Sequence, residues 1–151
     1  GQCLLERGAV AGGEESGGLS VRGHIPEKDG IMAGLLAVEI VATHGRSLAA
    51  LLEEVMNRFG RLHSDRIDIR TTQAEKERVL KKLGDFAPPE LGGGRVARRV
   101  ALDGVKLIRE DGAWVLVRAS GTEPVFRIYA EAGTPDEVAA IHNEVRAMLG
   151  L

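Results

Sequence analysis

The sequence contains a single cysteine, Cys3, which excludes an internal disulfide and a zinc site built from cysteine thiolates. A lone cysteine is typical of a small buried apolar residue in a reducing compartment, so we expect a cytoplasmic protein. No uninterrupted apolar stretch is long enough to span a bilayer, and the N-terminus lacks the residue order of a signal peptide. The formal net charge is only -2, so the electrostatics give no reason to expect binding to nucleic acid or to an anionic membrane.

What the chain does have is an ordinary globular composition, with 44% hydrophobic and 28% charged residues in 151 positions. That length suits one domain, or one domain with part of another. The 20 glycines cluster at positions 12–18 and 92–94. Such clusters predict loops that turn sharply or approach a ligand closely.

The first part of the chain contains two predicted helices. Asp29 is a suitable N-cap for a helix over 30–44, which is apolar on nearly every side and has Glu39 as its only charged residue. Ser47 is a suitable cap for a second, amphipathic helix that ends at Gly60. Before the helices we expect a short strand over 9–11 and then a loop-rich stretch to Asp29.

Two helices and one strand offer the apolar helix nothing to pack against. We therefore expect residues 1–62 to be the incomplete end of an α/β domain, covered by a sheet from missing N-terminal domains of the same protein or by association. The alternative is that residues 1–60 pack entirely on the second domain.

The second part, residues 63–151, predicts an α+β domain in the order strand, helix, strand, strand, strand, helix. Thr72 and Glu75 form a capping box for the first helix, and Thr134 caps the last one. The four expected strands lie around 67–69 and over 100–108, 114–118 and 125–130, with a hairpin turn at Asp111-Gly112. The expected fold is a four-stranded antiparallel sheet with two helices packed on one face.

The segment 118–124 joins two of these strands and has the composition of a phosphate site. The Arg118 guanidinium offers paired donors to an oxyanion, and Ser120 and Thr122 add hydroxyl groups. Gly121 allows the backbone N–H groups to turn toward the same point. The alternative is a plain polar turn between antiparallel strands.

A second group of polar residues lies in the glycine-rich loop 13–18 and in the segment 24–30. A carboxylate can accept hydrogen bonds from two neighbouring sugar hydroxyls, and Ser16 can donate or accept. Lys28 is either a general acid or base or a solvated charge, and His24 is either a catalyst or a hydrogen-bonded loop residue. No second histidine lies at a metal-ligand spacing on a shared helix, so we expect no metal site in this chain.

These three segments, 13–18, 24–30 and 118–124, occur in an order and at a spacing that resemble the C-terminal half of the α-D-phosphohexomutases. Within that family, residues 24–30 resemble the bacterial phosphoglucomutase and phosphomannomutase branch. Phosphoglucosamine mutases usually carry a glutamine and a histidine where this chain has Glu15 and Gly18, which argues against a glucosamine substrate.

The resemblance implies a four-domain enzyme in which residues 1–62 end the third domain and 63–151 form the fourth. Its members move a phosphoryl group between the 1- and 6-positions of a hexose, with Mg²⁺ and through a bisphosphorylated sugar such as glucose 1,6-bisphosphate. By the same resemblance, Lys28 is the candidate catalytic residue near the reacting hydroxyl. The implied substrate-binding residues are Glu14, Ser16, His24, Arg118, Ser120, Gly121, Thr122 and Arg127.

The chain also departs from the family pattern. It has neither the phosphoserine context nor the aspartate-rich magnesium loop, so we expect it to bind hexose phosphate without being catalytic alone. Gly18 stands where some members have a histidine proposed to assist proton transfer, which leaves the proton-transfer role of Lys28 or His24 open. The alternative function is a stand-alone sugar-phosphate-binding or protein-interaction module.

Overall fold

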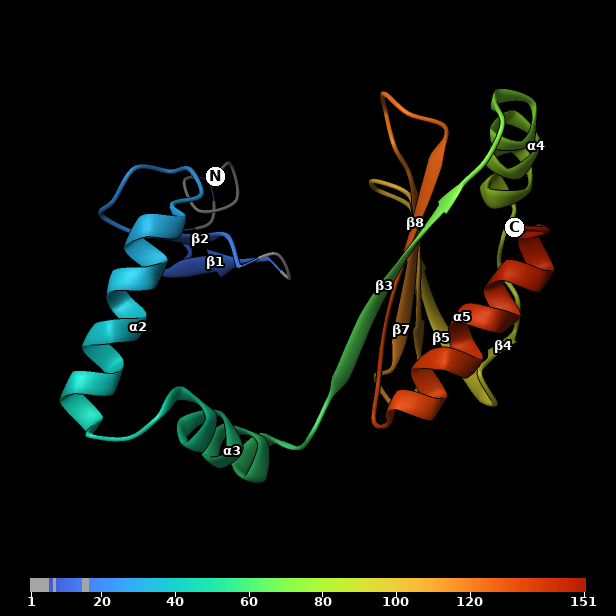
Figure 1. The fold of residues 1–151 in the computed structure, drawn as a ribbon. Helices are drawn as coiled ribbons and strands as arrows, with labels where there is room; N and C mark the ends of the chain where they lie inside the picture. The colour runs from blue at the N-terminus through green and yellow to red at the C-terminus, as the bar shows by residue number, and fades with distance from the viewer. Residues whose placement is uncertain (1–5, 7, 15–16) are drawn as a thin grey trace. The chain divides into compact units, whose positions relative to one another are not determined.

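The computed structural model describes residues 6, 8–14 and 17–151. The chain divides into two compact units, Gly1–Phe59 and Gly60–Leu151, which are described separately below (Figure 1). The elements of the first unit are β1 (Ala11–Gly13), β2 (Leu19–Val21), α2 (Gly30–His44) and α3 (Leu48–Phe59). Those of the second are β3 (His63–Arg70), α4 (Gln73–Gly84), β4 (Glu90–Leu91), β5 (Gly94–Val100), β6 (Val105–Arg109), β7 (Trp114–Ala119), β8 (Val125–Ala132) and α5 (Pro135–Leu149).

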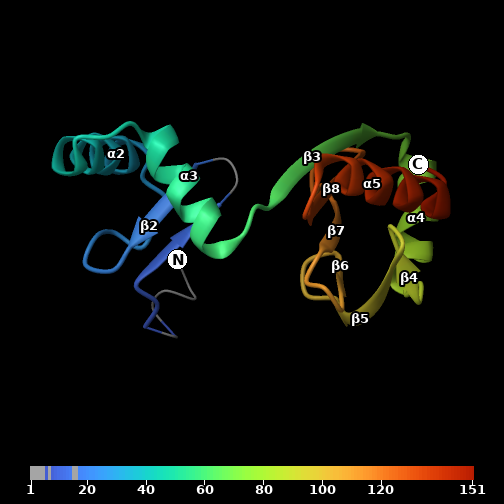
Figure 2. The same ribbon diagram turned by 90° about the horizontal axis from the view of Figure 1, so that it is seen from below.

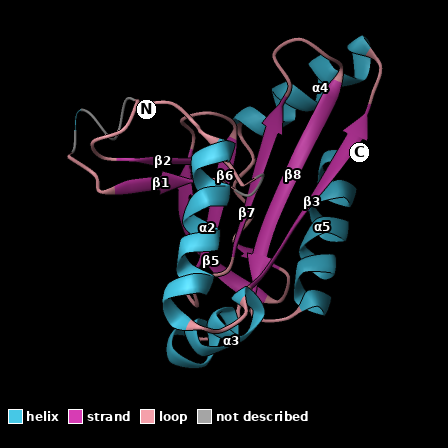
Figure 3. Cartoon of the chain, turned by 60° about the vertical axis from the view of Figure 1, so that its left-hand side comes forward, coloured by secondary structure: helices cyan, strands magenta, loops and turns pink. Residues whose placement is uncertain are grey.

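A short β-hairpin in the first unit presents the glycine-rich loop. Strands β1 and β2 are antiparallel, with Gly12 opposite Ser20 (Figure 3). The predicted strand over 9–11 is therefore wrong in position, because the strand forms where a partner strand is available and not where the local sequence is most apolar. The stretch expected to be loop contains β2 and most of β1.

Helix α2 begins and ends at the residues that the sequence indicates. The Asp29 carboxylate accepts hydrogen bonds from the N–H groups of Ile31 and Met32, at 3.0 and 2.9 Å, and Gly45 ends the helix in the left-handed conformation. No residue of α2 is buried within the described part of the chain, and Ile31 is 81% exposed. The expectation that further protein covers this helix stays a prediction.

No single helix in the described part of the chain is both long and apolar enough to cross a membrane. Helices α2 and α3 meet such a criterion only when taken together, and they are bent by 84° at the break between them.

The second unit is a six-stranded antiparallel sheet in the order β3-β8-β7-β6-β5-β4. The prediction of four strands is wrong in two places. The segment 100–108 turns at Gly104 and so belongs to two strands, β5 and β6. Only glycine fits at position 104, because a Cβ there would overlap the Val117 carbonyl oxygen. The proline- and glycine-rich loop over 88–94 also contains β4, which pairs with β5.

The sheet curls around α5, and its concave face forms the core (Figure 2). Alternate side chains of β6, β7 and β8 point inward against α5, with Phe126, Ile128 and Ile141 fully buried. The opposite, convex face carries the polar side chains, including Arg118 and Arg127. The predicted helices on one face of an antiparallel sheet are confirmed, and both predicted N-caps, at Thr72 and Thr134, are present.

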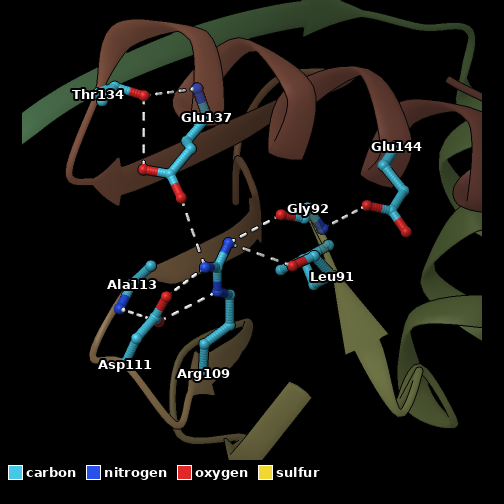
Figure 4. Close-up of polar contacts among 8 residues, drawn as sticks. All are labelled: Leu91, Gly92, Arg109, Asp111, Ala113, Thr134, Glu137 and Glu144. Atoms are coloured by element: carbon cyan, nitrogen blue, oxygen red, sulfur yellow. Dashed lines mark hydrogen bonds and ion pairs between the residues drawn. The ribbon is translucent and has the colours of Figure 1, made fainter. Parts of the chain in front are cut away.

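A buried arginine holds one end of this core together (Figure 4). The Arg109 side chain is 6% exposed, and its guanidinium donates to the carbonyl oxygens of Leu91 and Gly92, at 3.4 and 2.9 Å. It also forms ion pairs with Asp111 and with Glu137, the latter at 3.5 Å. Arg109 therefore links the β4–β5 turn, the β6–β7 turn and the first turn of α5.

The glycines of the β4–β5 turn fit this arrangement. A Cβ at Gly94 would overlap the Arg109 guanidinium, and one at Gly92 would come within 2.6 Å of Cγ1 of Ile141. The Gly92 N–H donates to the Glu144 carboxylate on α5. Gly92 and Gly94 thus allow close packing of protein on protein.

A buried histidine predicts a pH dependence of stability. His142 on α5 lies with Nδ1 3.7 Å from Asp65, and within the described residues its Nε2 has no hydrogen-bond partner. Burial lowers the pKa of His142 below 6.5, more than the Asp65 carboxylate raises it, and Arg146 lowers it further. Below pH 6.5 the unfolded chain therefore binds more protons at this site than the folded one, so stability falls as the pH falls.

We expect the urea midpoint of the second unit, followed by the fluorescence of Trp114, to decrease between about pH 7.5 and pH 5.5. The variant His142→Gln should lose part of this slope, whatever its absolute stability. An equal slope in both proteins would contradict the assignment to His142.

Candidate functional site

The loop between β1 and β2 brings a carboxylate and an ammonium group together. The Glu14 N–H donates to the Gly18 carbonyl oxygen at 3.1 Å, which closes the loop. The Glu14 carboxylate is paired with Lys28, whose Nζ lies 3.1 Å from Oε1 and 3.3 Å from Oε2. Lys28 remains 57% exposed, so its ammonium is held in place while still open to a ligand. Ser16, the other predicted hydroxyl-binding residue of this loop, lies outside the described residues.

Gly18 makes this ion pair possible. A Cβ at position 18 would lie 2.6 Å from Oε1 of Glu14 and 2.9 Å from Cδ of Lys28. The carboxylate and the lysine stem thus occupy the space that a side chain would need. The Glu14–Lys28 ion pair therefore lies beside Gly18, the position at which some members of the resembling family carry a histidine.

His24 contacts the cap of α2. Its Nε2 lies 2.9 Å from Oδ2 of Asp29. The pKa of Asp29 is lowered, first by the hydrogen bond from the Met32 N–H and then by the one from His24. The Asp29 N–H also donates to the carbonyl oxygen of Leu19, which ties the segment 24–30 to β2. This contact gives His24 a structural role, and its predicted role in substrate binding stays a prediction.

In the second unit, the predicted phosphate loop is the connection between β7 and β8. The Ser120 N–H donates to the Val125 carbonyl oxygen at 2.8 Å, and the Glu123 N–H donates to the Ser120 hydroxyl at 3.3 Å. Within the described part of the chain, the N–H groups of Gly121 and Thr122 have no hydrogen-bond partner. The loop therefore offers two consecutive open donors at its tip, flanked by two hydroxyl-bearing side chains.

Three carbonyl oxygens of the same loop are occupied, those of Ser120, Glu123 and Pro124. The ammonium of Lys76 on α4 donates to the carbonyl oxygens of Ser120 and Glu123, at 2.7 and 3.0 Å. The N–H and the hydroxyl of Thr71 both donate to the Pro124 carbonyl oxygen, at 2.8 and 3.1 Å. The carbonyl groups of Ser120, Glu123 and Pro124 are therefore taken, while the N–H groups of Gly121 and Thr122 stay open to an anion.

Two arginines lie beside the loop on the convex face of the sheet. Arg118 and Arg127 are directly opposite each other in the β7–β8 ladder. Nε of Arg118 is 3.1 Å from the Asp103 carboxylate, and Nε of Arg127 is 3.8 Å from that of Asp68. Arg118 is 46% exposed, so its guanidinium is accessible for the paired contact that phosphate favours.

Sequence reasoning missed Thr71, Lys76 and Asp103. Thr71 and Lys76 lie 44 to 53 positions before the loop residues that they contact, so no local pattern marks them. The Asp103-Gly104 pair has the same turn chemistry as Asp111-Gly112 and could have been recognised as a turn, although not as the partner of Arg118.

Other hollows and clusters in the described residues do not add to this site. A cavity of about 420 Å³ between β3 and α5 is lined by His63, Asp65 and His142, among others. It lies at the opposite end of β3 from the phosphate loop, because His63 pairs with Ala132 and Arg70 with Val125. No three His, Cys, Asp or Glu side chains in the described part of the chain could together hold a metal ion.

Comparison with known proteins identifies the family. Residues 1–59 match the family model of the phosphoglucomutase/phosphomannomutase α/β/α domain III, and residues 67–148 match that of the phosphoglucomutase/phosphomannomutase C-terminal domain. The chain belongs to the phosphoglucomutase/phosphomannomutase family. The resemblance of its three loops to this family is thereby confirmed.

Individual members of the phosphoglucomutase/phosphomannomutase family agree. The chain is 33% identical over 136 residues, 90% of its length, to a phosphoglucomutase/phosphomannomutase of Thermococcus kodakarensis, and 37% identical over 136 residues, 80% of its length, to a phosphoglucomutase of Komagataeibacter xylinus. It is 32% identical over 146 residues, 97% of its length, to a probable phosphoglucosamine mutase of Methanothermobacter thermautotrophicus. These matches cover 27%, 24% and 31% of the relatives, so the chain spans about a quarter to a third of their length.

The crystal structure of a phosphoglucomutase/phosphomannomutase family protein from Burkholderia thailandensis has the same fold. The TM-score is 0.70 at 25% sequence identity, over 98% of this chain and 29% of that one.

Proposed function

We propose that this chain is the C-terminal part of a phosphohexomutase that interconverts hexose 1-phosphate and hexose 6-phosphate through a bisphosphorylated intermediate. In this proposal the chain binds and orients the substrate, and the phosphoryl group is transferred by residues that precede it. The partners are a hexose phosphate and the N-terminal domains of the same protein.

The observation that carries the proposal is the donor-rich loop between β7 and β8. The open N–H groups of Gly121 and Thr122, the hydroxyls of Ser120 and Thr122 and the guanidinium of Arg118 belong to five consecutive residues. Such a set binds the phosphate that stays on the sugar and thereby orients the other end of the molecule for in-line attack. Arg127, opposite Arg118, adds positive charge beside the loop.

In the first unit, Glu14 and Lys28 supply contacts to sugar hydroxyls. A carboxylate accepts hydrogen bonds from hydroxyl groups, and an ammonium donates to a hydroxyl oxygen. Because Lys28 is paired with Glu14, it is held as a donor beside Gly18, and we assign to it the contact with the reacting hydroxyl. Ser16 and His24 complete the proposed hydroxyl-binding set.

The proposed reaction also needs a metal ion and a phosphorylated serine, and the described residues provide a site for neither. The described residues offer no metal site, so Mg²⁺ in the complete enzyme is held elsewhere in the protein, and no step is assigned to it here. The chain also lacks the serine context of the phosphorylated family nucleophile. We therefore expect the 151-residue chain alone to bind hexose phosphate weakly and to be inactive.

The test compares this chain with the longer protein that contains it. Both are assayed for conversion of glucose 1-phosphate and mannose 1-phosphate, with glucose 1,6-bisphosphate and Mg²⁺ present. We expect turnover by the longer protein alone, with a phosphoserine loop encoded in frame upstream. Turnover by the isolated chain would refute its assigned role. A start codon immediately before Gly1 would instead support the alternative function of a stand-alone sugar-phosphate-binding module.

A further inference from the structure

Lys76 lies outside the phosphate loop and contacts two of its carbonyl groups. Two N–H groups of its ammonium are used by the carbonyl oxygens of Ser120 and Glu123, which lie on either side of the open N–H groups of Gly121 and Thr122. In Figure 1, α4 lies at the end of the sheet where the β7–β8 connection turns. The lysine thus contacts the loop both before and after Gly121 and Thr122.

The electrostatic consequence concerns the loop backbone. A carbonyl oxygen is partially negative and repels the oxygens of a phosphate, whereas an N–H group attracts them. The Ser120 C=O and the Gly121 N–H belong to one trans peptide group and point in opposite directions, so a Ser120 carbonyl held by Lys76 directs the Gly121 N–H away from the lysine. Without the lysine, the Ser120 carbonyl would have no partner among the described residues, whereas the Glu123 carbonyl would still accept a hydrogen bond from the Val125 N–H.

The support for Lys76 is itself rigid. Lys76 lies in the first turns of α4, where Thr72 and Glu75 form a complete capping box, with hydrogen bonds of 3.2 Å from the Glu75 N–H and 2.7 Å from the Thr72 N–H. The neighbouring Thr71 holds the Pro124 carbonyl oxygen. A contact made from a capped helix fixes the loop more accurately than one made from a second loop.

We propose that Lys76 is a positioning residue that holds the Ser120 carbonyl group of the β7–β8 loop away from the bound phosphate and so directs the Gly121 N–H toward it. The inference rests on the proposed function, because it presupposes that this loop binds the phosphate of the substrate. Lys76 acts through the loop backbone and not as a direct ligand.

The test is a titration of the 151-residue chain with inorganic phosphate and then with glucose 6-phosphate, followed by the amide resonances of Gly121 and Thr122. Lys76→Met should raise the dissociation constant about tenfold. It should also shift these two resonances before any ligand is added and speed hydrogen exchange of the Ser120 N–H. Lys76→Arg should recover part of the affinity. Lys81→Met, at an exposed position on the same helix, removes the same charge and should change the affinity less than twofold.

The outcomes separate the two ideas. If the unaltered chain binds neither ligand at this loop, the proposed function fails. If it binds them and Lys76→Met binds them equally well, the positioning role is wrong. If affinity falls while the ligand-free resonances stay unchanged, Lys76 is a direct ligand, which also overturns the proposal. Should Lys76→Met not fold, Lys76→Gln is the second variant. The affinities of the Lys76 variant and of Lys81→Met are also compared at high salt, which screens long-range charge. A difference that persists at high salt comes from the geometry of the loop.

Discussion

Replacing Arg118 by alanine is expected to lower kcat/KM of the complete mutase for hexose phosphates about 100-fold. The Arg118 side chain is 46% exposed and has the only guanidinium in the 118–124 segment, so under the proposed function the truncation removes a paired contact to the phosphate. Under the same proposal, loss of that contact lets the sugar tilt and misplaces the reacting hydroxyl. The measurement is steady-state kinetics in both directions of the reaction.

Two further variants sharpen this experiment. Arg118→Lys keeps the charge but loses the planar fork, so we expect it to recover only part of the activity. Arg95→Ala is the matched control, because Arg95 is 76% exposed on the same sheet and its nearest acidic partner, Glu110, is 3.9 Å away. A change smaller than threefold in Arg118→Ala would mean that this connection is a plain polar turn.

Replacing Arg109 by methionine is expected to destabilise the second unit by about 2 kcal/mol, because the carbonyl oxygens of Leu91 and Gly92 lose their buried donor. The buried side chain has hydrogen bonds to two carbonyl oxygens and ion pairs to Asp111 and Glu137. Methionine fills much of the same volume but donates no hydrogen bond. The measurement is urea unfolding followed by Trp114, the single tryptophan, which lies in β7 and reports on this unit.

The control is again an exposed arginine, with Arg95→Met expected to change stability by less than about 0.5 kcal/mol. Gly94→Ala should reproduce much of the Arg109→Met effect, because the added Cβ would overlap the guanidinium. A loss below about 1 kcal/mol in Arg109→Met would show that the network contributes little beyond the packing of the arginine stem.

The parts of the fold that depend on neighbouring residues could be predicted from the sequence. The caps at Asp29, Thr72 and Thr134 and the turn at Asp111-Gly112 are hydrogen-bond patterns within a few residues, and the structure contains them all. The strand errors have another origin. Strand β1 and the short β4 exist because a partner strand lies beside them, and local composition does not contain that information.

The same distinction applies to the candidate site. The residue types of the 118–124 segment are visible in the sequence, since donors at that spacing have a chemical meaning by themselves. Three carbonyl groups of the segment, those of Ser120, Glu123 and Pro124, are bound by Lys76 and Thr71, and these contacts arise only when the chain around α4 and the β7–β8 connection meet in the folded unit. The partner of Arg118, Asp103, likewise depends on strand register.

The ion pairs of the ligand-free protein have a consequence for how a substrate is admitted. Arg118 is paired with Asp103, Arg127 with Asp68 and Lys28 with Glu14. Each cation assigned to hexose phosphate therefore already has a resident counter-ion. Under the proposed function, an arriving phosphate exchanges places with a carboxylate, so the charge of these side chains alone does not attract every anion. The choice among anions then depends on whether the arriving anion binds the fixed N–H groups better than the displaced carboxylate would.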